Sequence, residues 1–158
     1  MFTIDDIRNI AIQIEQNGEE TYRQVSKESA NPKIAELFNW MADEEKRHAN
    51  WFQNIKSSKP LETEHEELAL MGKNLLQDMV KDQTFSLDKQ ALNDEKNLVL
   101  MLQQSITFEL DTILFYEFLA QLINDTETQK QLNLIIKEER EHAQHLTELA
   151  ENIEAKTV

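Results

Sequence analysis

The sequence repeats one set of metal-binding side-chain types at a fixed offset. Its first half holds Glu15, Glu45 and His48, and each has a counterpart 94 positions later, namely Glu109, Glu139 and His142. In both halves 30 positions separate the two glutamates, and the second glutamate opens a Glu-x-x-His motif. Iron and manganese accept this mixture of carboxylate and imidazole ligands, whereas a closed tetrahedral zinc site does not need six ligands. The repeat therefore indicates a site for two metal ions.

Helices must position these side chains. Apolar residues recur at alternating steps of three and four, the spacing of one helix face, over residues 4–25, 34–55, 98–123 and 132–153. Asn31-Pro32 is a start signal for the second helix, with asparagine as the N-cap and proline at the first helical position. The run Asn124-Asp125-Thr126 separates the last two helices in the same way.

These elements predict an all-α fold, a ferritin-like four-helix bundle with a long crossover between the second and third helices. We expect one domain over residues 1–158, made of helical hairpins at about 3–57 and 94–155 with a crossover at about 58–93. Apolar residues near 68–79 predict a shorter helix within the crossover. A link of this length lets the flanking helices run parallel, and the 94-residue repeat predicts a pseudo-two-fold axis between the hairpins.

Each predicted ligand falls on a helix face that should be apolar. A buried glutamate is costly unless it is paired or bound to a metal, so six such groups on core faces favour a metal site over a solvated surface. Residues three apart share a helix face, which lets each Glu-x-x-His direct both groups at one point. By the internal symmetry we expect Glu45 and Glu139 to bridge the two ions. The terminal ligands would then be Glu15 with His48 on one ion and Glu109 with His142 on the other.

Two tyrosines follow the first glutamate of each half by seven residues. Tyr22 and Tyr116 would lie two helical turns from Glu15 and Glu109, on the same face. Each could donate a hydrogen bond to a carboxylate that holds metal, or could simply pack in the core. We predict the hydrogen-bonding role for both.

Composition narrows the classes of partner. The formal net charge of -14 argues against nucleic acid and anionic membranes, and it would attract cations. The absence of cysteine excludes thiolate ligands and disulfides within this sequence. We see no signal-peptide pattern and no apolar run of about 20 residues. The expected location is therefore the cytoplasm, with no membrane contact.

Four segments resemble the rubrerythrin-like branch of the ferritin-like superfamily. They read AIQIEQNGEETYRQV, LFNWMADEEKRHANWF, SITFELDTILFYEF and IIKEEREHAQHL, and together with their surroundings they cover most of the chain outside the crossover. The resemblance implies a centre of two iron ions, with manganese as the alternative, that reacts with hydrogen peroxide or dioxygen. It also implies a homodimer.

The sequence departs from that family in two respects. Rubrerythrins proper carry a cysteine-ligated rubredoxin-type domain that supplies electrons, and these residues contain no cysteine. The resemblance therefore implies an external electron donor, either a rubredoxin-like protein or a flavoprotein. Rubrerythrins also place a further glutamate where this sequence has Thr112, which leaves the symmetric six-residue ligand set that bacterioferritins share.

Three functions are compatible with such a centre. The first is a redox enzyme that reduces peroxide or dioxygen. The second is a ferroxidase that uses dioxygen and leads to iron storage, and the third is a metal-binding module without turnover. The residues alone leave the three open.

Overall fold

The computed structural model describes residues 4–55, 70, 74, 95–123 and 125–156, and within them it contains four long helices and no strand. The helices are α1 (Ile4–Glu28), α2 (Pro32–Asn54), α4 (Glu95–Leu122) and α5 (Thr126–Lys156). The predicted all-α, four-helix-bundle fold is confirmed. The expected crossover, with its short helix, lies outside the described residues apart from positions 70 and 74.

Short capped turns join the two helices of each hairpin. The Asn31 side chain accepts hydrogen bonds from the backbone N–H groups of Lys33 at 2.9 Å and Ile34 at 3.4 Å, and Pro32 opens α2. Before α5, an oxygen of Asp125 accepts a hydrogen bond from the N–H of Thr128 at 2.9 Å. Both start signals therefore act as predicted, because each supplies an acceptor to otherwise unpaired N–H groups.

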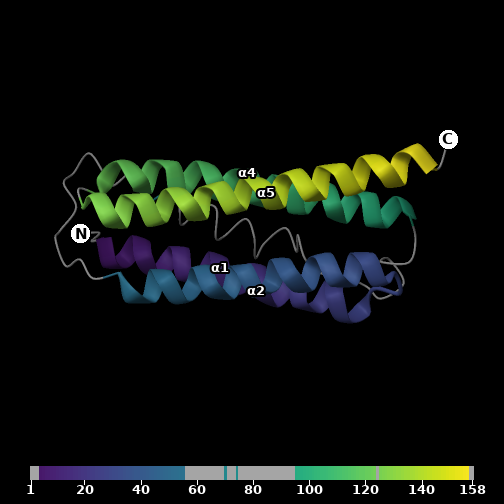
Figure 1. Ribbon diagram of the computed structural model, residues 1–158, viewed down its shortest axis with the longest axis horizontal. Helices are drawn as coiled ribbons and strands as arrows, with labels where there is room; N and C mark the ends of the chain where they lie inside the picture. Colours follow the sequence, from purple (N-terminus) through teal and green to yellow (C-terminus); the bar gives the residue numbers. More distant parts are fainter. Residues whose placement is uncertain (1–3, 56–69, 71–73, 75–94, 124, 157–158) are drawn as a thin grey trace.

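The two hairpins lie one on the other along the length of the bundle (Figure 1). The hairpin α1–α2 forms one layer and α4–α5 the other, and side-chain contacts join α1 to α4 and α2 to α5. The colours of Figure 1 show α2 and α4 running in the same direction, as the long crossover predicted. Consequently α1 and α4 are antiparallel, and so are α2 and α5.

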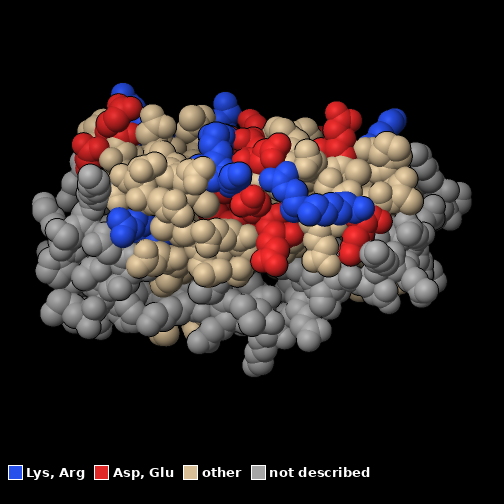
Figure 2. Space-filling view, turned by 90° about the horizontal axis from the view of Figure 1, so that it is seen from below, with Lys and Arg blue, Asp and Glu red and all other residues tan. Residues whose placement is uncertain are grey.

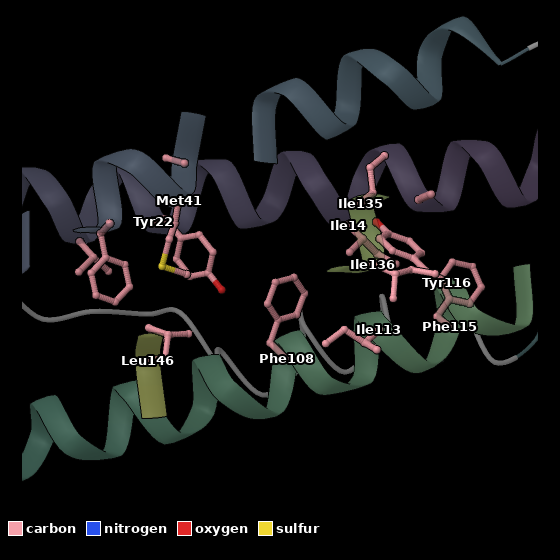
Figure 3. Close-up of a cluster of buried hydrophobic side chains, with 14 of the residues drawn as sticks. Ile14, Tyr22, Met41, Phe108, Ile113, Phe115, Tyr116, Ile135, Ile136 and Leu146 are labelled. Atoms are coloured by element: carbon pink, nitrogen blue, oxygen red, sulfur yellow. The ribbon is translucent and has the colours of Figure 1, made fainter. Parts of the chain in front are cut away.

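A continuous apolar core fills the space between the layers (Figure 3). All four helices contribute to it, with fully buried side chains such as Ile14, Phe38, Leu102 and Leu146. Burying one large apolar side chain stabilises a fold by about 1.5–3 kcal/mol. This packing on either side of the centre lets the bundle tolerate a polar cluster in its middle.

Helix α4 is apolar on its outer face as well as its inner one. Leu110, Leu114 and Phe118 are 54%, 48% and 43% exposed, and the positions that they repeat in α1 are Gln16, Glu20 and Gln24. By length and composition, Asn97–Gln121 could cross a membrane, which the sequence analysis did not anticipate. Half of its most apolar window is buried in the bundle, however, and core helices of bundles meet the same criterion.

Candidate metal centre

The six predicted ligands meet in the middle of the bundle, and none is more than 1% exposed. Their ligand atoms form two groups, and in each group the atoms lie within 4.8 Å of one another. The first group is Glu15, Glu45, His48 and Glu139, and the second is Glu45, Glu109, Glu139 and His142. Glu45 and Glu139 belong to both groups, which is the arrangement expected of bridging carboxylates. The structure thus brings together every residue that the repeat singled out.

Both histidines direct Nδ1 towards the carboxylates. The Nδ1 atom of His48 lies 2.7 Å from Glu139 Oε1 and 3.5 Å from Glu15 Oε2. The Nδ1 atom of His142 lies 3.1 Å from Glu45 Oε1 and 3.3 Å from Glu139 Oε2. Glu139 therefore contacts both histidines, one through each oxygen.

Several buried atoms of the cluster have no hydrogen-bond partner among the described residues. They are one carboxylate oxygen on each of the four glutamates and Nδ1 of His142 (Glu15 Oε2, Glu45 Oε1, Glu109 Oε2, Glu139 Oε2). Buried polar atoms are almost always paired in folded proteins, since leaving one unpaired costs about 1–3 kcal/mol. Cations between these atoms would satisfy them, and four carboxylates offset the charge of two divalent ions. The donor set therefore fits a pair of metal ions.

The carboxyl groups of the metal-free cluster cannot all be ionised together. Burial, followed by the charge of Glu139, raises the pKa of Glu45 and of Glu109 well above the usual range. Burial also opposes ionisation of Glu139, but its interactions with Glu109 and His48 outweigh burial and hold its pKa well below the usual range. Without metal, the cluster therefore favours the protonated forms of Glu45 and Glu109 and the ionised form of Glu139.

The carboxylates keep both histidines protonated when no metal is bound. Burial alone would lower the pKa of His48, but Glu15 and Glu139 raise it to about 10. In the same way, interactions with Glu109 and Glu139 overcome burial and raise the pKa of His142 well above its usual value. A metal ion must displace these protons before either Nδ1 can bind it.

Each tyrosine forms a hydrogen bond with a glutamate of the opposite hairpin. The Tyr22 hydroxyl donates a hydrogen bond to Glu109 Oε1 at 2.5 Å, and the Tyr116 hydroxyl donates one to Glu15 Oε1 at 2.6 Å. Burial, with the negative charge of the partner, raises the pKa of both tyrosines well above the usual value, so both remain donors. The predicted contact with a carboxylate is present, but it crosses between hairpins.

A second pair of glutamates lies outside the histidines. Glu138 Oε2 is 3.3 Å from His48 Nε2, and Glu44 Oε1 is 3.9 Å from His142 Nε2. The interaction with His142 outweighs burial and, together with Arg47, lowers the pKa of Glu44 to about 2. Sequence reasoning gave these residues no role, although Glu44 and Glu138 are 94 positions apart and so belong to the repeat. Carboxylates behind histidine ligands orient the ring and fix its tautomer.

Gly18 makes room for the carboxylate of Glu45, which belongs to both ligand groups. A Cβ atom on Gly18 would lie 3.0 Å from Glu45 Oε2 and 3.5 Å from Phe108 Cε1. The position that repeats Gly18 is Thr112, which is 1% exposed and whose hydroxyl has no hydrogen-bond partner among the described residues. The two halves therefore line the centre differently at this pair of positions.

Replacing Gly18 by alanine should separate fold stability from metal binding. Alanine favours a helix by about 1 kcal/mol over glycine, so the metal-free protein should be at least as stable as the wild type. Glu45 would have to move by a few tenths of an ångström, and we expect about tenfold weaker metal binding, the size of effect seen for groups that support ligands. Urea unfolding and calorimetric titration with Mn²⁺ measure the two quantities. In the exposed control Gln16→Ala, metal affinity should not change.

Trp40 lies against one of the candidate ligands, whereas Glu19 and Asp43 form surface ion pairs. Trp40 makes edge-on ring contacts with His142 and His145, with centroids 5.2 Å and 5.5 Å apart. Glu19 pairs with Arg23 at 3.5 Å, away from the centre, and Asp43 pairs with Arg23 at 2.9 Å. Figure 2, seen from the side of α1 and α2, shows acidic and basic side chains interleaved on that face. Glu19 and Asp43 are therefore surface groups, and His65 lies outside the described residues.

One comparison with known protein families matches the first hairpin and its motifs. The family model for rubrerythrin matches residues 6–73. No curated protein and no solved structure gives a significant match. The matched segment contains Glu15, Glu45 and His48, and the second hairpin repeats the same ligand types in the same geometry. Over its first hairpin, the chain is therefore similar to rubrerythrin.

Proposed function

We propose that this protein is a di-iron carboxylate redox protein that reduces hydrogen peroxide, or dioxygen, with electrons from an external donor. One observation carries the proposal: two buried ligand groups share Glu45 and Glu139 and leave carboxylate oxygens unpaired. Their mixture of oxygen and nitrogen ligands suits iron, and manganese is the alternative. Two adjacent ions are suited to a two-electron reaction.

The protein itself would position the two ions, offset their charge and exclude water from the centre. When bound, two ferrous ions supply one electron each, and peroxide takes up two electrons and two protons to give two molecules of water. The four glutamates offset the charge of the ions, and Tyr22 and Tyr116 hold the terminal carboxylates in place. Complete burial of the six ligands limits side reactions with solvent.

The electrons that restore the ferrous state would come from another protein. The sequence contains no cysteine and therefore no iron–sulfur relay of its own. A rubredoxin-like protein or a flavoprotein would provide single electrons at the potential that such a centre needs. Reduction of the ferric protein by each candidate donor, followed in the absence of oxygen, tests this part of the proposal.

The choice of oxidant is tested on protein loaded anaerobically with ferrous iron. One equivalent of hydrogen peroxide should oxidise the iron faster than an equal concentration of dioxygen, because the two available electrons reduce peroxide completely to water, whereas dioxygen needs four. Absorbance of the ferric product, followed by stopped flow, gives both rates. Equal rates, or a faster reaction with dioxygen, would argue against peroxide as the substrate.

Thr112 is the observation that favours a second candidate function, ferroxidase activity with iron storage. The rubrerythrin pattern has a glutamate at this position, and the buried threonine leaves the six-residue set that bacterioferritins share. Storage requires a large hollow assembly, whereas the redox enzyme needs only the expected homodimer. The exposed apolar residues of α4, Leu110, Leu114 and Phe118, support contact with a second copy. Light scattering distinguishes a dimer from a shell.

A further inference from the structure

Arg47 joins the two hairpins at the surface of the bundle, outside the two histidines. The side chain is 54% exposed, and its guanidinium group contacts Glu44 on its own helix and Glu138 on α5. Both carboxylates are mostly covered, at 14% and 13% exposure. The position that repeats Arg47 is Glu141, which is exposed. One arginine therefore neutralises both members of a symmetric acidic pair.

These groups form successive layers between solvent and the centre. Arg47 is outermost, and Glu44 and Glu138 come next, facing the Nε2 atoms of His142 and His48. The two imidazole rings lie nearly parallel, with an interplanar angle of 23° and centroids 6.2 Å apart. Their Nδ1 atoms face the six-residue cluster on the inner side. A cation that approaches from this side meets the layers in that order.

Two observations indicate that the acidic pair can hold a cation. Single ligand atoms of Glu44, Glu138 and His48 lie within 4.8 Å of one another, a spacing that a metal ion can fill. Independently, Nε2 of His142, whose side chain is fully buried, faces Glu44 without a hydrogen-bond partner among the described residues. The guanidinium of Arg47 thus sits where two carboxylates from different hairpins converge.

We propose that Glu44 and Glu138 are a docking site for divalent cations on their way to the buried centre, and that Arg47 is a tethered cation that blocks it. This inference rests on the proposed metal centre. The strongly acidic chain attracts cations, and the carboxylate pair concentrates them at one point. An arriving ion must displace Arg47, which can swing into solvent because more than half of its surface is already exposed.

Uptake of Co²⁺ by the metal-free protein tests the proposal without any redox step. Arg140→Ala is the matched control, because Arg140 is 58% exposed, contacts only the exposed Glu117 among the described residues, and carries the same charge. At low ionic strength we expect Arg47→Ala to take up Co²⁺ about tenfold faster than the wild type, within the range that local charge produces, and Arg140→Ala to stay close to it. Stopped-flow absorbance of the bound cobalt gives the rates.

Removal of the Arg47 side chain should accelerate both the binding and the release of metal ions. Release of Co²⁺ to a chelator should therefore also be faster in Arg47→Ala, and the dissociation constant should change less than either rate. The second variant, Glu138→Gln, weakens the docking site and should slow uptake. Circular dichroism and thermal unfolding verify that each variant is folded.

The outcomes distinguish failure of the proposed Arg47 gate from failure of the proposed metal centre. If the wild type binds no Co²⁺, the proposed metal centre itself is wrong. If the wild type binds Co²⁺ but Arg47→Ala takes it up no faster than Arg140→Ala, the metal centre stands and the gate is wrong. Faster uptake in Arg47→Ala alone, with slower uptake in Glu138→Gln, supports the gate.

Discussion

Glu139→Ala will bind neither metal ion, whereas Glu15→Ala will still bind one. Glu139 belongs to both ligand groups and contacts both histidines, so its removal takes a ligand from each ion at once. Glu15 belongs to the first group alone. Loss of a supporting group typically costs 10–100-fold in metal affinity, and we expect the loss of a shared ligand to exceed about 100-fold at each site.

Calorimetric titration with Mn²⁺ or Co²⁺ in the absence of oxygen gives stoichiometry and affinity together. We expect two ions in the wild type, one in Glu15→Ala and none in Glu139→Ala. A bound ion at about 1,000 times its dissociation constant stabilises a fold by about 4 kcal/mol, so two ions should raise the wild-type melting temperature by roughly 20 °C.

The exposed Glu141 provides the control for lost charge on the same helix. Glu141→Ala should bind both ions and keep the full thermal shift. Two ions bound to Glu139→Ala with wild-type affinity would show that this carboxylate is not a ligand, and would remove the bridging arrangement from the proposed function.

Binding of two divalent ions near pH 7 will release about four protons. Without metal, raised pKa values keep protons on Glu45, Glu109, His48 and His142, and each group must lose its proton to act as a ligand. Metal affinity should therefore rise steeply with pH. Titration calorimetry in buffers with different heats of ionisation counts the protons directly.

The same pKa shifts determine how the stability of the metal-free protein depends on pH. The pKa of His48 is about 10 in the folded protein and about 6.5 in the unfolded chain, so its stabilising effect is complete below pH 6.5 and is lost as the pH rises towards 10. The raised pKa values of Glu45 and Glu109 act in the same direction above pH 4.5.

The free energy of unfolding of the metal-free protein should therefore fall between about pH 5 and pH 10. Urea unfolding in the presence of a chelator measures it, and saturating Mn²⁺ should reverse the trend. Stability of the chelated protein that rises over this range, or release of fewer than about two protons on metal binding, would show that the cluster is already ionised before metal arrives.

The helices, and the meeting of the six candidate ligands, could be predicted because two independent patterns in the sequence agree. Apolar spacing placed four helix faces, and the 94-residue repeat placed Glu15, Glu45 and their partners on those faces. Capping chemistry located the start of α2 at Asn31-Pro32 to within a residue. Each of these signals can be read along the sequence and does not require knowledge of how the helices pack.

Contacts between helices could not be predicted, because they depend on register. Tyr22 lies about 10.5 Å along the helix from Glu15, which is too far for a hydrogen bond. Its true partner, Glu109, is set by the antiparallel packing of α1 against α4. The sequence likewise does not indicate a partner for Arg47 outside its own helix, because the packing of α5 against α2 brings Glu138 to it. The apolar outer face of α4 was missed because a helix that is apolar all round gives no contrast between its faces.

The contacts that cross between the hairpins would be the same if the hairpins were separate chains. Tyr22 with Glu109, Tyr116 with Glu15, and each histidine with the outer glutamate of the other half all join one copy of the repeat to the next. A single ancestral hairpin of this kind, paired with itself around a two-fold axis, would already supply six ligands. Duplication and fusion would then have freed the two halves to diverge, and Arg47 opposite Glu141, and Gly18 opposite Thr112, are differences that a pair of identical hairpins could not hold.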